Sequence, residues 1–371
     1  MEIEKLKNTI QDCNLNFLVG SGLSVPYFTT LGNTELLLTE LSKNKTLKED
    51  EIEIIRVSIL GKYYEEVISK NPIIIDDSKV GPHKTLVMNN YKDFLVYLNT
   101  IVLKRKSTIL NKQVNLFTTN IDVFFEKALE ETQLEYNDGF YGRFNPVFSL
   151  TNFKKSLFKK SLHYDNTSEI PVFNLLKVHG SLTWKSEKEK IVYSELKETE
   201  EIKAIWEKVK GKVIDFTHTD NLKHFIKEVS SKTHDSTFSD FLAAYDKLAI
   251  VNPTKEKFQD TILNLQYYEL LRVFSNELEK ENTILFIMGF SLADEHIREI
   301  VLRAANSNPT LTIKIFAYDS PSKVIIEENI QKGNTTIRYN NIEVIEPEAS
   351  VFYDLKTINS SVFKEILNKI D

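Results

Sequence analysis

The sequence predicts an α/β fold built on a doubly wound parallel sheet, and three observations carry this prediction. Short apolar runs without alternation recur along the chain, which is typical of strands buried on both faces. Segments with helical periodicity separate these runs, as in repeated strand–helix units. Several runs end in glycine or polar residues, at the edge where open α/β sheets bind ligands. We expect a single domain over residues 1–371, with helical insertions.

Composition excludes several classes of protein. The 47 basic and 53 acidic residues give a net charge of −6, which provides no electrostatic footprint for nucleic acid or an anionic membrane. Cys13 is the only cysteine, so the chain can form neither an internal disulfide nor a cysteine-rich zinc site. A reducing compartment, the cytoplasm, is the simplest interpretation. No run of about twenty apolar residues is present, so we expect no membrane span.

The first strong strand runs from Phe17 to Val19 and ends in a glycine-serine-glycine turn. Gly20 and Gly22 carry no Cβ, so the backbone can turn sharply and approach another group closely. With a helix predicted from about Thr34 to Leu41, the turn would aim N–H groups and a helix dipole at an anion such as a pyrophosphate. The third glycine of a full dinucleotide-binding pattern is missing, and no Walker A lysine follows. A tight turn that only closes the strand is the alternative.

Two stretches are interpreted as insertions. A short lead-in helix is predicted over residues 2–13, before the first strand. From Thr34 to about Arg105 the pattern is mainly helical, with breaks at Pro72 and Gly81-Pro82. We interpret residues 34–112 as a helical insertion. Residues 185–246 are rich in charge and poor in apolar side chains, which predicts a second charged, partly helical insertion.

Polar residues follow the next two strands. Val114–Thr119 is followed by Asn120 and Asp122, and Phe173–Val178 is followed by His179. The carboxyl ends of parallel strands share one edge of a sheet, so these side chains are candidate ligand-binding groups. Asn120 and Asp122 could instead cap the helix that follows them, and such a histidine is commonly a core or capping residue. The aromatic-rich segment from Gly139 to about Ile170 is predicted to be irregular and to cover the pocket as a lid.

The last third of the chain continues the strand–helix pattern. The strand Thr283–Met288 stops at Gly289, and Ser291 with Asp294 predicts the start of a helix that reaches about Ala305. The remaining predicted elements are a strand at Leu248–Val251, a helix from about Leu265 to Leu278, and strands at Thr312–Tyr318 and Ile342–Ile345.

Taken together, these strand ends resemble the sirtuin family. The resemblance rests on Gly20-Ser21-Gly22 with Ser24, on Thr119-Asn120-Ile121-Asp122, and on Lys177-Val178-His179-Gly180-Ser181, in this order and spacing. The later run Gly289-Phe-Ser-Leu-Ala-Asp-Glu-His-Ile297 is similar to the sirtuin-like branch found in bacterial defence proteins. The resemblance covers about Leu15 to Tyr318 and implies a Rossmann-like core. Neither insertion takes part in it.

The resemblance implies NAD as ligand and assigns the site residues by position. It places Gly20, Ser21 and Gly22 at the pyrophosphate, with Ser24 at the turn. Asn120 and Asp122 match the residues at the nicotinamide ribose and carboxamide, and Thr119 beside them is a further cofactor-binding candidate. His179 matches the catalytic histidine, Gly289 and Ser291 lie on the adenosine side, and Asp319 is the candidate for the adenine ribose.

Two departures from the family separate this chain from sirtuin deacylases. Those enzymes usually carry two Cys-x-x-Cys pairs for a structural zinc, whereas this chain has one cysteine, so we expect no zinc module. Their glycine loop continues into Pro-Asp-Phe-Arg, whereas Pro26-Tyr27-Phe28-Thr29 lacks both the acid and the base. Both differences argue against an acyl-peptide substrate and leave the NAD site intact.

Cleavage of NAD at its nicotinamide bond needs support for an oxocarbenium-like transition state and a positioned nucleophile. Asn120 can hold a ribose hydroxyl or the attacking water, and His179 can act as base near neutral pH. The resemblance implies an NAD hydrolase of bacterial anti-phage defence that forms homo-oligomers and partners a HerA-like ATPase. The alternatives are an NAD-dependent protein deacylase and a non-catalytic sensor of NAD or ADP-ribose.

Overall fold

The computed structural model describes residues 2–30, 32–107, 109–217, 220–251, 261–333 and 338–370, without the side chains of 261–264. Its central sheet contains short strands whose residues are mostly buried. These strands are β1 (Asn14–Val19), β2 (Gln113–Thr118), β3 (Tyr136–Asn137), β8 (Val172–Lys177), β12 (Thr283–Met288), β13 (Leu311–Phe316) and β14 (Ile342–Ile345).

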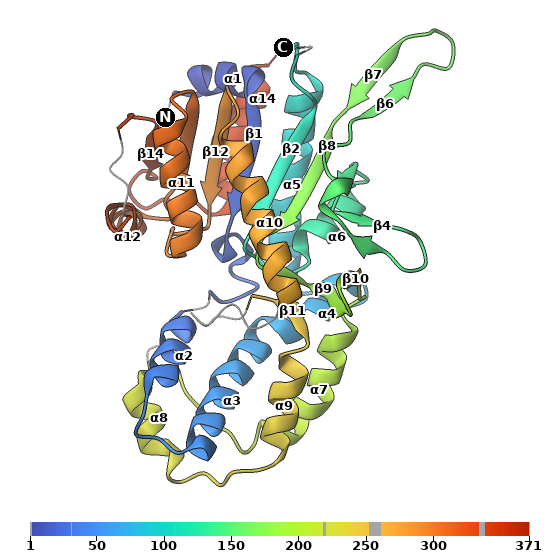
Figure 1. Cartoon of the computed structure of the whole chain (residues 1–371). Coiled ribbons are helices and arrows are strands. Elements are labelled where there is room, and N and C mark those ends of the chain that lie inside the picture. The colour runs from blue at the N-terminus through green and yellow to red at the C-terminus, as the bar shows by residue number, and fades with distance from the viewer. Residues whose placement is uncertain are drawn as a thin grey trace.

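In the described part of the chain this sheet has seven strands in the order β14-β13-β12-β1-β2-β8-β3, and every pair is parallel (Figure 1). The chain adds β2 and β8 on one side of β1 and later places β12 on the other side. The strand order therefore reverses at β1, which creates the topological switch point of a doubly wound sheet. The predicted Rossmann-like α/β fold is confirmed.

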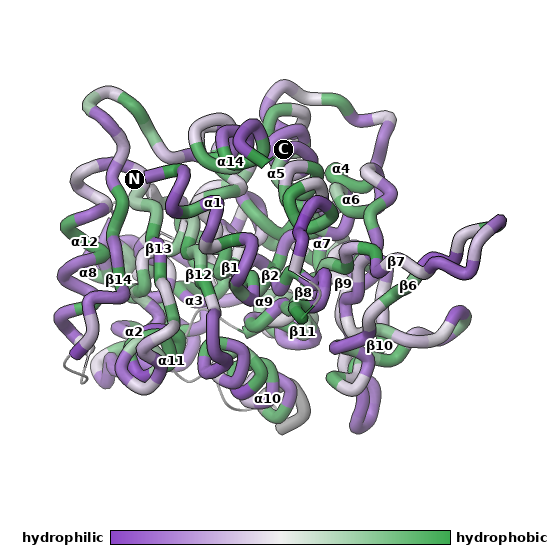
Figure 2. Tube along the Cα trace, turned by 90° about the horizontal axis from the view of Figure 1, so that it is seen from above, coloured by the Kyte–Doolittle hydropathy of each residue, from purple (hydrophilic) through white to green (hydrophobic). Residues whose placement is uncertain are grey.

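Helices cover both faces of this sheet (Figure 2). One face packs on α5 (Pro82–Leu103) and α6 (Phe124–Glu131), and the other packs on α10 (Thr261–Leu278) and α11 (Glu295–Ser307), next to α12 (Ser320–Gln331). The first face also receives elements from both ends of the chain. These are α1 (Ile3–Asp12), α13 (Leu355–Ile358), the π-helical turn η4 (Asn359–Phe363) and α14 (Lys364–Asn368). None of the described helices has both the length and the apolar character needed to cross a membrane.

The chain also forms a second, antiparallel sheet from strands that lie before and after β8 in the sequence. It contains β11 (Leu248–Ile250), β9 (Gly180–Glu187), β10 (Lys190–Tyr193), β5 (Val147–Phe148) and β4 (Phe140–Tyr141), in that order. Phe148 packs against Trp184 with ring centroids 4.7 Å apart. The segment predicted to be irregular therefore contributes two strands to this sheet.

The rest of that segment does not form the predicted lid. Its later part is a hairpin of β6 (Leu157–Lys160) and β7 (Thr167–Ile170), which projects from the body of the molecule (Figure 1). The side chain of Gln113, the first residue of β2, donates to the Ser156 hydroxyl at the base of the hairpin (3.3 Å). The hairpin therefore lies at the amino ends of the strands, opposite to the edge that it was expected to cover.

A helical lobe lies beyond the carboxyl ends of the strands (Figure 1). It contains α2 (Thr34–Lys43) and α3 (Glu49–Glu66) together with α7 (Lys197–Val209), α8 (Leu222–Val229) and α9 (Thr237–Tyr245). A Cβ on Gly61 of α3 would lie 2.1 Å from the Trp206 ring of α7, so this glycine makes room for close helix packing. Stretches predicted as separate insertions thus share one lobe, whereas α5, also within residues 34–112, packs against α6.

Candidate functional site

The turn after β1 packs directly on the turn after β12. The N–H of Gly20 donates to Met288 O (3.0 Å), and the N–H of Gly22 donates to Gly289 O (3.1 Å). A Cβ on Gly20 would lie 2.4 Å from Gly289 O, and one on Gly22 would lie 2.9 Å from Gly289 Cα. Gly289 itself has a φ of +61°, a conformation that favours glycine. The close approach inferred from the sequence is therefore, in part, a contact between two turns at the switch point.

The helix expected after the glycine turn does not follow it directly. A short 3₁₀ helix, η1 (Ser21–Ser24), comes first, and α2 begins only at Thr34 and packs against α3 and α8 in the helical lobe. The helix predicted from about Thr34 to Leu41 is therefore confirmed, but Val25–Thr30 separates it from the glycine turn. The Ser21 hydroxyl is half-buried and has no hydrogen-bond partner among the described residues, so it can contact a phosphate.

A buried network joins the turn after β1 to the turn after β2. The Ser24 hydroxyl lies 3.0 Å from Asp122 Oδ2, 2.9 Å from the Tyr91 hydroxyl and 3.4 Å from Asn120 Nδ2. All four side chains are buried. The amide of Asn120 can only donate to Ser24 and an ionised Asp122 can only accept, so Ser24 gives its one proton to Asp122 and Tyr91 donates to Ser24. Ser24, Asn120 and Asp122 are thus brought into contact, as their motifs suggested.

Asp122 also begins the next helix. Its Oδ1 accepts the N–H of Phe124 (3.1 Å), the first residue of α6. Burial raises the pKa of the Asp122 carboxyl, and Lys177 opposes this effect by lowering it. Lys177 donates to the Asp122 carbonyl and pairs with Glu126 (2.8 Å). Capping and site formation are therefore combined in one residue.

Asn120 offers a free acceptor at this edge. Its N–H donates to the Thr118 hydroxyl (3.0 Å), and its buried Oδ1 has no hydrogen-bond partner among the described residues. An unpaired buried carbonyl is costly, so this oxygen is suited to a ligand hydroxyl or water. The neighbouring Thr119 is half-buried, and its N–H donates to Val19 O (3.0 Å).

His179 lies at the end of β8, the strand next to β2. Its Nε2 is 3.4 Å from Asp294 Oδ2, and its ring centroid is 6.0 Å from that of Tyr267. The His179 carbonyl accepts the N–H of Val251 (2.8 Å), which fixes the backbone. Within the described residues His179 Nε2 makes no hydrogen bond, although the side chain is only 17% exposed. The structure pairs His179 with Asp294, while no hydrogen bond in this part of the chain joins it to Asn120.

Ser291 does not start a helix. The N-cap of α11 is Asp294, whose side chain accepts the N–H of Ile297 (3.1 Å). Leu292 between them has a φ of +59°, which no α-helix accommodates, so the helix cannot begin at Ser291. Ser291 is exposed, and its carbonyl accepts from the Asn329 side chain (2.9 Å).

Asp319, the candidate for the adenine ribose, follows β13. Its Oδ1 caps α12 by accepting the N–H of Ser322 (2.8 Å), so any ribose contact would use Oδ2. Its role and the other assigned roles stay predictions.

Sequence reasoning missed Tyr91, Lys177, Asp294 and Tyr267 as site residues. Lys177 and Asp294 stand inside the motifs and could have been included. Tyr91 lies in a segment interpreted as an insertion, where nothing in the sequence marks it.

The described residues contain no group of three or more His, Cys, Asp or Glu side chains placed to hold a metal ion. The sequence model of a family described as a SIR2-like domain matches residues 114–345, more than half of the chain. The chain belongs to the SIR2-like family. The match runs from β2 to β14 and includes Asn120, His179 and Gly289. No curated protein matches the sequence significantly.

Membership of the SIR2-like family confirms the sirtuin-like resemblance at family level. It supports an NAD-related function and is consistent with an NAD-dependent enzyme.

Proposed function

We propose that this SIR2-like protein hydrolyses NAD to nicotinamide and ADP-ribose. The proposal rests on two buried polar atoms, Asn120 Oδ1 and His179 Nε2, which make no hydrogen bond among the described residues, although Asp294 Oδ2 lies 3.4 Å from the histidine nitrogen. They follow adjacent strands, β2 and β8, at the carboxyl edge of a doubly wound sheet. In doubly wound sheets nucleotides generally bind at this edge, and a ligand that forms hydrogen bonds with both atoms would remove the cost of leaving them unsatisfied.

The chemistry follows from these two groups. Asn120 Oδ1 accepts a hydrogen bond from the attacking water or a ribose hydroxyl. The water oxygen forms a bond to C1′ of the ribose as the bond from C1′ to the nicotinamide nitrogen breaks, and the leaving ring takes the electron pair and becomes neutral. The proton of the water passes to His179, and the Asp294 carboxylate 3.4 Å away stabilises the imidazolium that forms.

The remaining residues bind and orient the substrate. The Ser21 hydroxyl is available to the pyrophosphate, beside the glycine turn. Asp122 already accepts from Ser24 and Phe124, one bond to each oxygen, which leaves lone pairs for the carboxamide. Tyr91 holds Ser24 and thereby fixes the orientation of Asp122.

The biological setting is part of the proposal. The run from Gly289 to Ile297 is similar to bacterial defence proteins, so we place NAD hydrolysis in anti-phage defence in the cytoplasm, by a homo-oligomer that acts with a HerA-like ATPase. This part rests on analogy, because one fold hosts many functions. Loss of cellular NAD on phage infection, only when both proteins are expressed, is the expected result.

The first test is nicotinamide release from NAD by the wild type, Asn120→Ala and His179→Ala, with and without a HerA-like ATPase. Removing a positioned base or acceptor is expected to lower turnover by at least about 100-fold. His83→Ala is the matched control, because His83 is exposed near the start of α5 and its loss should leave turnover unchanged. Full activity in His179→Ala would contradict the mechanism.

The same assay separates the alternatives. Turnover of an acetyl-lysine peptide to O-acetyl-ADP-ribose would favour a deacylase, although the single cysteine cannot build the zinc module of that class. NAD binding without turnover, together with a biological effect that survives in His179→Ala, would favour a sensor.

A further inference from the structure

A row of asparagines crosses the main sheet on the face covered by α10. Asn16 of β1, Asn115 of β2 and Asn174 of β8 stand in register on neighbouring strands, and Asn137 of β3 continues the row. Asparagine is depleted in strands, and burying its amide is costly unless it is paired. The next row toward the carboxyl edge on this face is apolar and comprises Leu18, Phe117 and Leu176. The polar row is thus a local departure from an apolar face.

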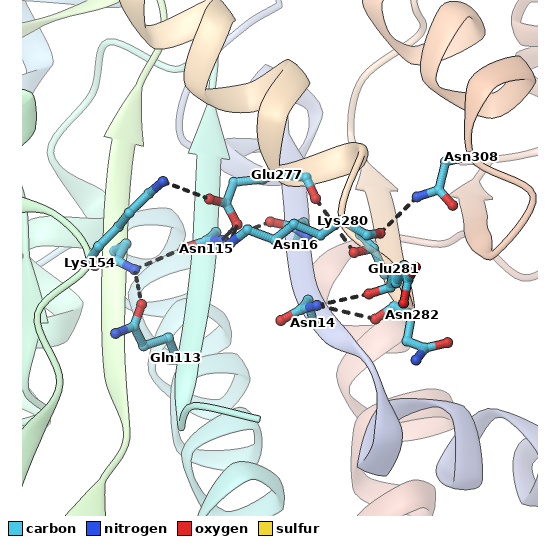
Figure 3. Close-up of polar contacts among 12 residues, drawn as sticks. Asn14, Asn16, Gln113, Asn115, Lys154, Glu277, Lys280, Glu281, Asn282 and Asn308 are labelled. Carbon is cyan, nitrogen blue, oxygen red and sulfur yellow. Dashed lines mark hydrogen bonds and ion pairs between the residues drawn. The ribbon is translucent and has the colours of Figure 1, made fainter. Parts of the chain in front are cut away.

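The hydrogen bonds of the row all run in one direction. Asn174 Nδ2 donates to Asn115 Oδ1 (2.8 Å), and Asn115 Nδ2 donates to Asn16 Oδ1 (2.9 Å; the Asn115–Asn16 contact is drawn in Figure 3). Among the described residues a donor, Asn16 Nδ2, and an acceptor, Asn174 Oδ1, remain without a hydrogen-bond partner at the two ends of this run of three asparagines. These residues are 0% and 2% exposed, so water does not replace the missing partners freely. The row ends in an unsatisfied acceptor on β8.

A cavity of about 60 Å³ adjoins this end of the row, with Asn174 in its wall. This space holds about four water molecules, or the polar edge of a larger molecule whose remainder lies outside the cavity. Its polar wall also includes Asn115 and Gln113, and its apolar wall includes Phe153 and Val273. The cavity lies near the amino ends of the strands, since Asn16 precedes Gly20 by about 13 Å along β1. It is therefore distinct from the candidate NAD site.

A buried carboxylate faces the row from α10. Glu277 is only 6% exposed at its side chain, and its Oε2 accepts from Asn115 Nδ2 (3.2 Å; Figure 3). Lys154 reaches Glu277 Oε1 at 3.8 Å, and Lys280 pairs with Oε2 (Figure 3). These lysines are 66% and 44% exposed. Fixed acceptors therefore line the inner wall of the cavity, and flexible cations line its rim.

This arrangement selects a class of ligand. The unpaired acceptor of Asn174 requires an N–H donor, and the Glu277 carboxylate, which already accepts from Asn115, has further lone pairs for one. The cations of Lys154 and Lys280 suit a carbonyl or ring-nitrogen acceptor. An anion would be repelled by Glu277, and a cation would be repelled by the lysines. The apolar wall suits a planar ring. We propose that this cavity binds the polar edge of a small, neutral, planar molecule that carries an amino group beside an acceptor.

Aromatic carboxamides and amino-substituted nucleobases share this edge. Nicotinamide is the carboxamide that the proposed function would produce, so the nicotinamide part of the proposal rests on that function. Adenine carries the same pattern in its amino group and ring nitrogen, and its binding would not depend on NAD hydrolysis.

The test is calorimetric titration of the full chain with nicotinamide and with adenine, using benzoate as an anionic control of similar shape. We expect saturable binding of at least one of the two neutral probes and none of benzoate. Glu277→Gln should weaken binding at least tenfold by replacing an acceptor with a donor, and Val273→Phe should abolish it by filling the cavity. Glu279→Gln is the matched control, because Glu279 is exposed just beyond the same helix.

Asn120→Ala separates this site from the candidate NAD site. We expect it to lower NAD turnover by at least about 100-fold while leaving the binding of the neutral probe unchanged. The proposal is overturned if neither probe binds, if binding survives in Glu277→Gln, or if binding is lost in Asn120→Ala. Thermal melting establishes that each variant is folded, and Glu277→Gln decides the question if Val273→Phe is not.

Discussion

At the scale of single residues, Tyr91 and Tyr245 differ in whether the side-chain hydroxyl has a hydrogen-bond partner. Both side chains are fully buried, and burial raises the pKa of each well above its ordinary value, so both stay neutral. The Tyr91 hydroxyl lies 2.9 Å from Ser24 Oγ, whereas that of Tyr245 has no hydrogen-bond partner in the described ranges. The same change to phenylalanine should therefore have opposite consequences.

Tyr91→Phe is expected to lower the free energy of unfolding by about 1 kcal/mol, because a buried hydrogen bond is lost. Tyr245→Phe should be neutral or stabilising, because it removes a buried hydroxyl that lacks a partner. Urea denaturation of both variants measures the difference. Equal losses of stability would show that the Tyr91–Ser24 contact contributes nothing.

At the scale of elements, the two turns at the switch point depend on glycine. Gly20→Ala would place a Cβ 2.4 Å from Gly289 O, and Gly289→Ala would place one 2.6 Å from Leu23 N at a positive φ. We expect each change to destabilise the protein by about 1–3 kcal/mol, since both turns must move. Gly211→Ala is the control, because its added Cβ would meet no atom within 4 Å. Chemical denaturation compares the three variants, and similar midpoints for all would refute the packing argument.

Strands that are buried on both faces were predicted well. The bounds of β12 agree with its apolar run, and all of its residues are buried. The bounds of the edge strand β14 also agree with the prediction. The two-residue strands β4 and β5 are too short to carry a pattern, so the second sheet was missed. The start of α11 was missed because the conformation of Leu292 depends on tertiary contacts.

The residues of the candidate site likewise fall into two groups, those that the sequence predicted to lie together and those that it did not. Ser24, Asn120 and Asp122 come together because their motifs end neighbouring strands, which sequence order already implies. Tyr91 also contacts this group, but it lies on α5, and the hydrophobic periodicity of a helix does not reveal which part of the fold the helix packs against. The asparagine row depends on strand register, and Asn16 and Asn115 lie 99 residues apart, so the alignment becomes visible only in three dimensions.

At the scale of the whole molecule, the helical lobe is held together by contacts between distant segments. His234 Nε2, before α9, lies 2.7 Å from Glu53 Oε2 of α3, and the Glu53 carboxylate raises the pKa of His234 above its ordinary value of 6.5. A histidine whose pKa is raised on folding contributes stability fully below pH 6.5, and this contribution is lost as the pH rises through the folded pKa. The stability of the lobe should therefore fall as the pH rises from 6.5 through the folded-state pKa of His234.

The two tryptophans allow this pH dependence to be measured. Trp206 lies in the lobe and Trp184 in the second sheet, so Trp184→Phe leaves fluorescence that reports on the lobe alone. We expect the melting temperature of the lobe to fall as the pH rises above 6.5. In His234→Gln this part of the pH dependence should disappear. If the pH dependence of the melting temperature is unchanged in that variant, the His234–Glu53 pair does not contribute to the stability of the lobe.

The position of β1 in the sheet has a consequence for synthesis on the ribosome. Its second neighbour, β12, emerges late: Asn14 bonds to Glu281, just before β12, across 267 residues of sequence. At about 5–20 residues per second, the apolar edge of β1 waits roughly ten seconds to a minute for that neighbour. During this interval one edge of β1, whose second half is fully apolar, has no partner strand, so the yield of the protein in cells should depend on chaperones that shield such strands.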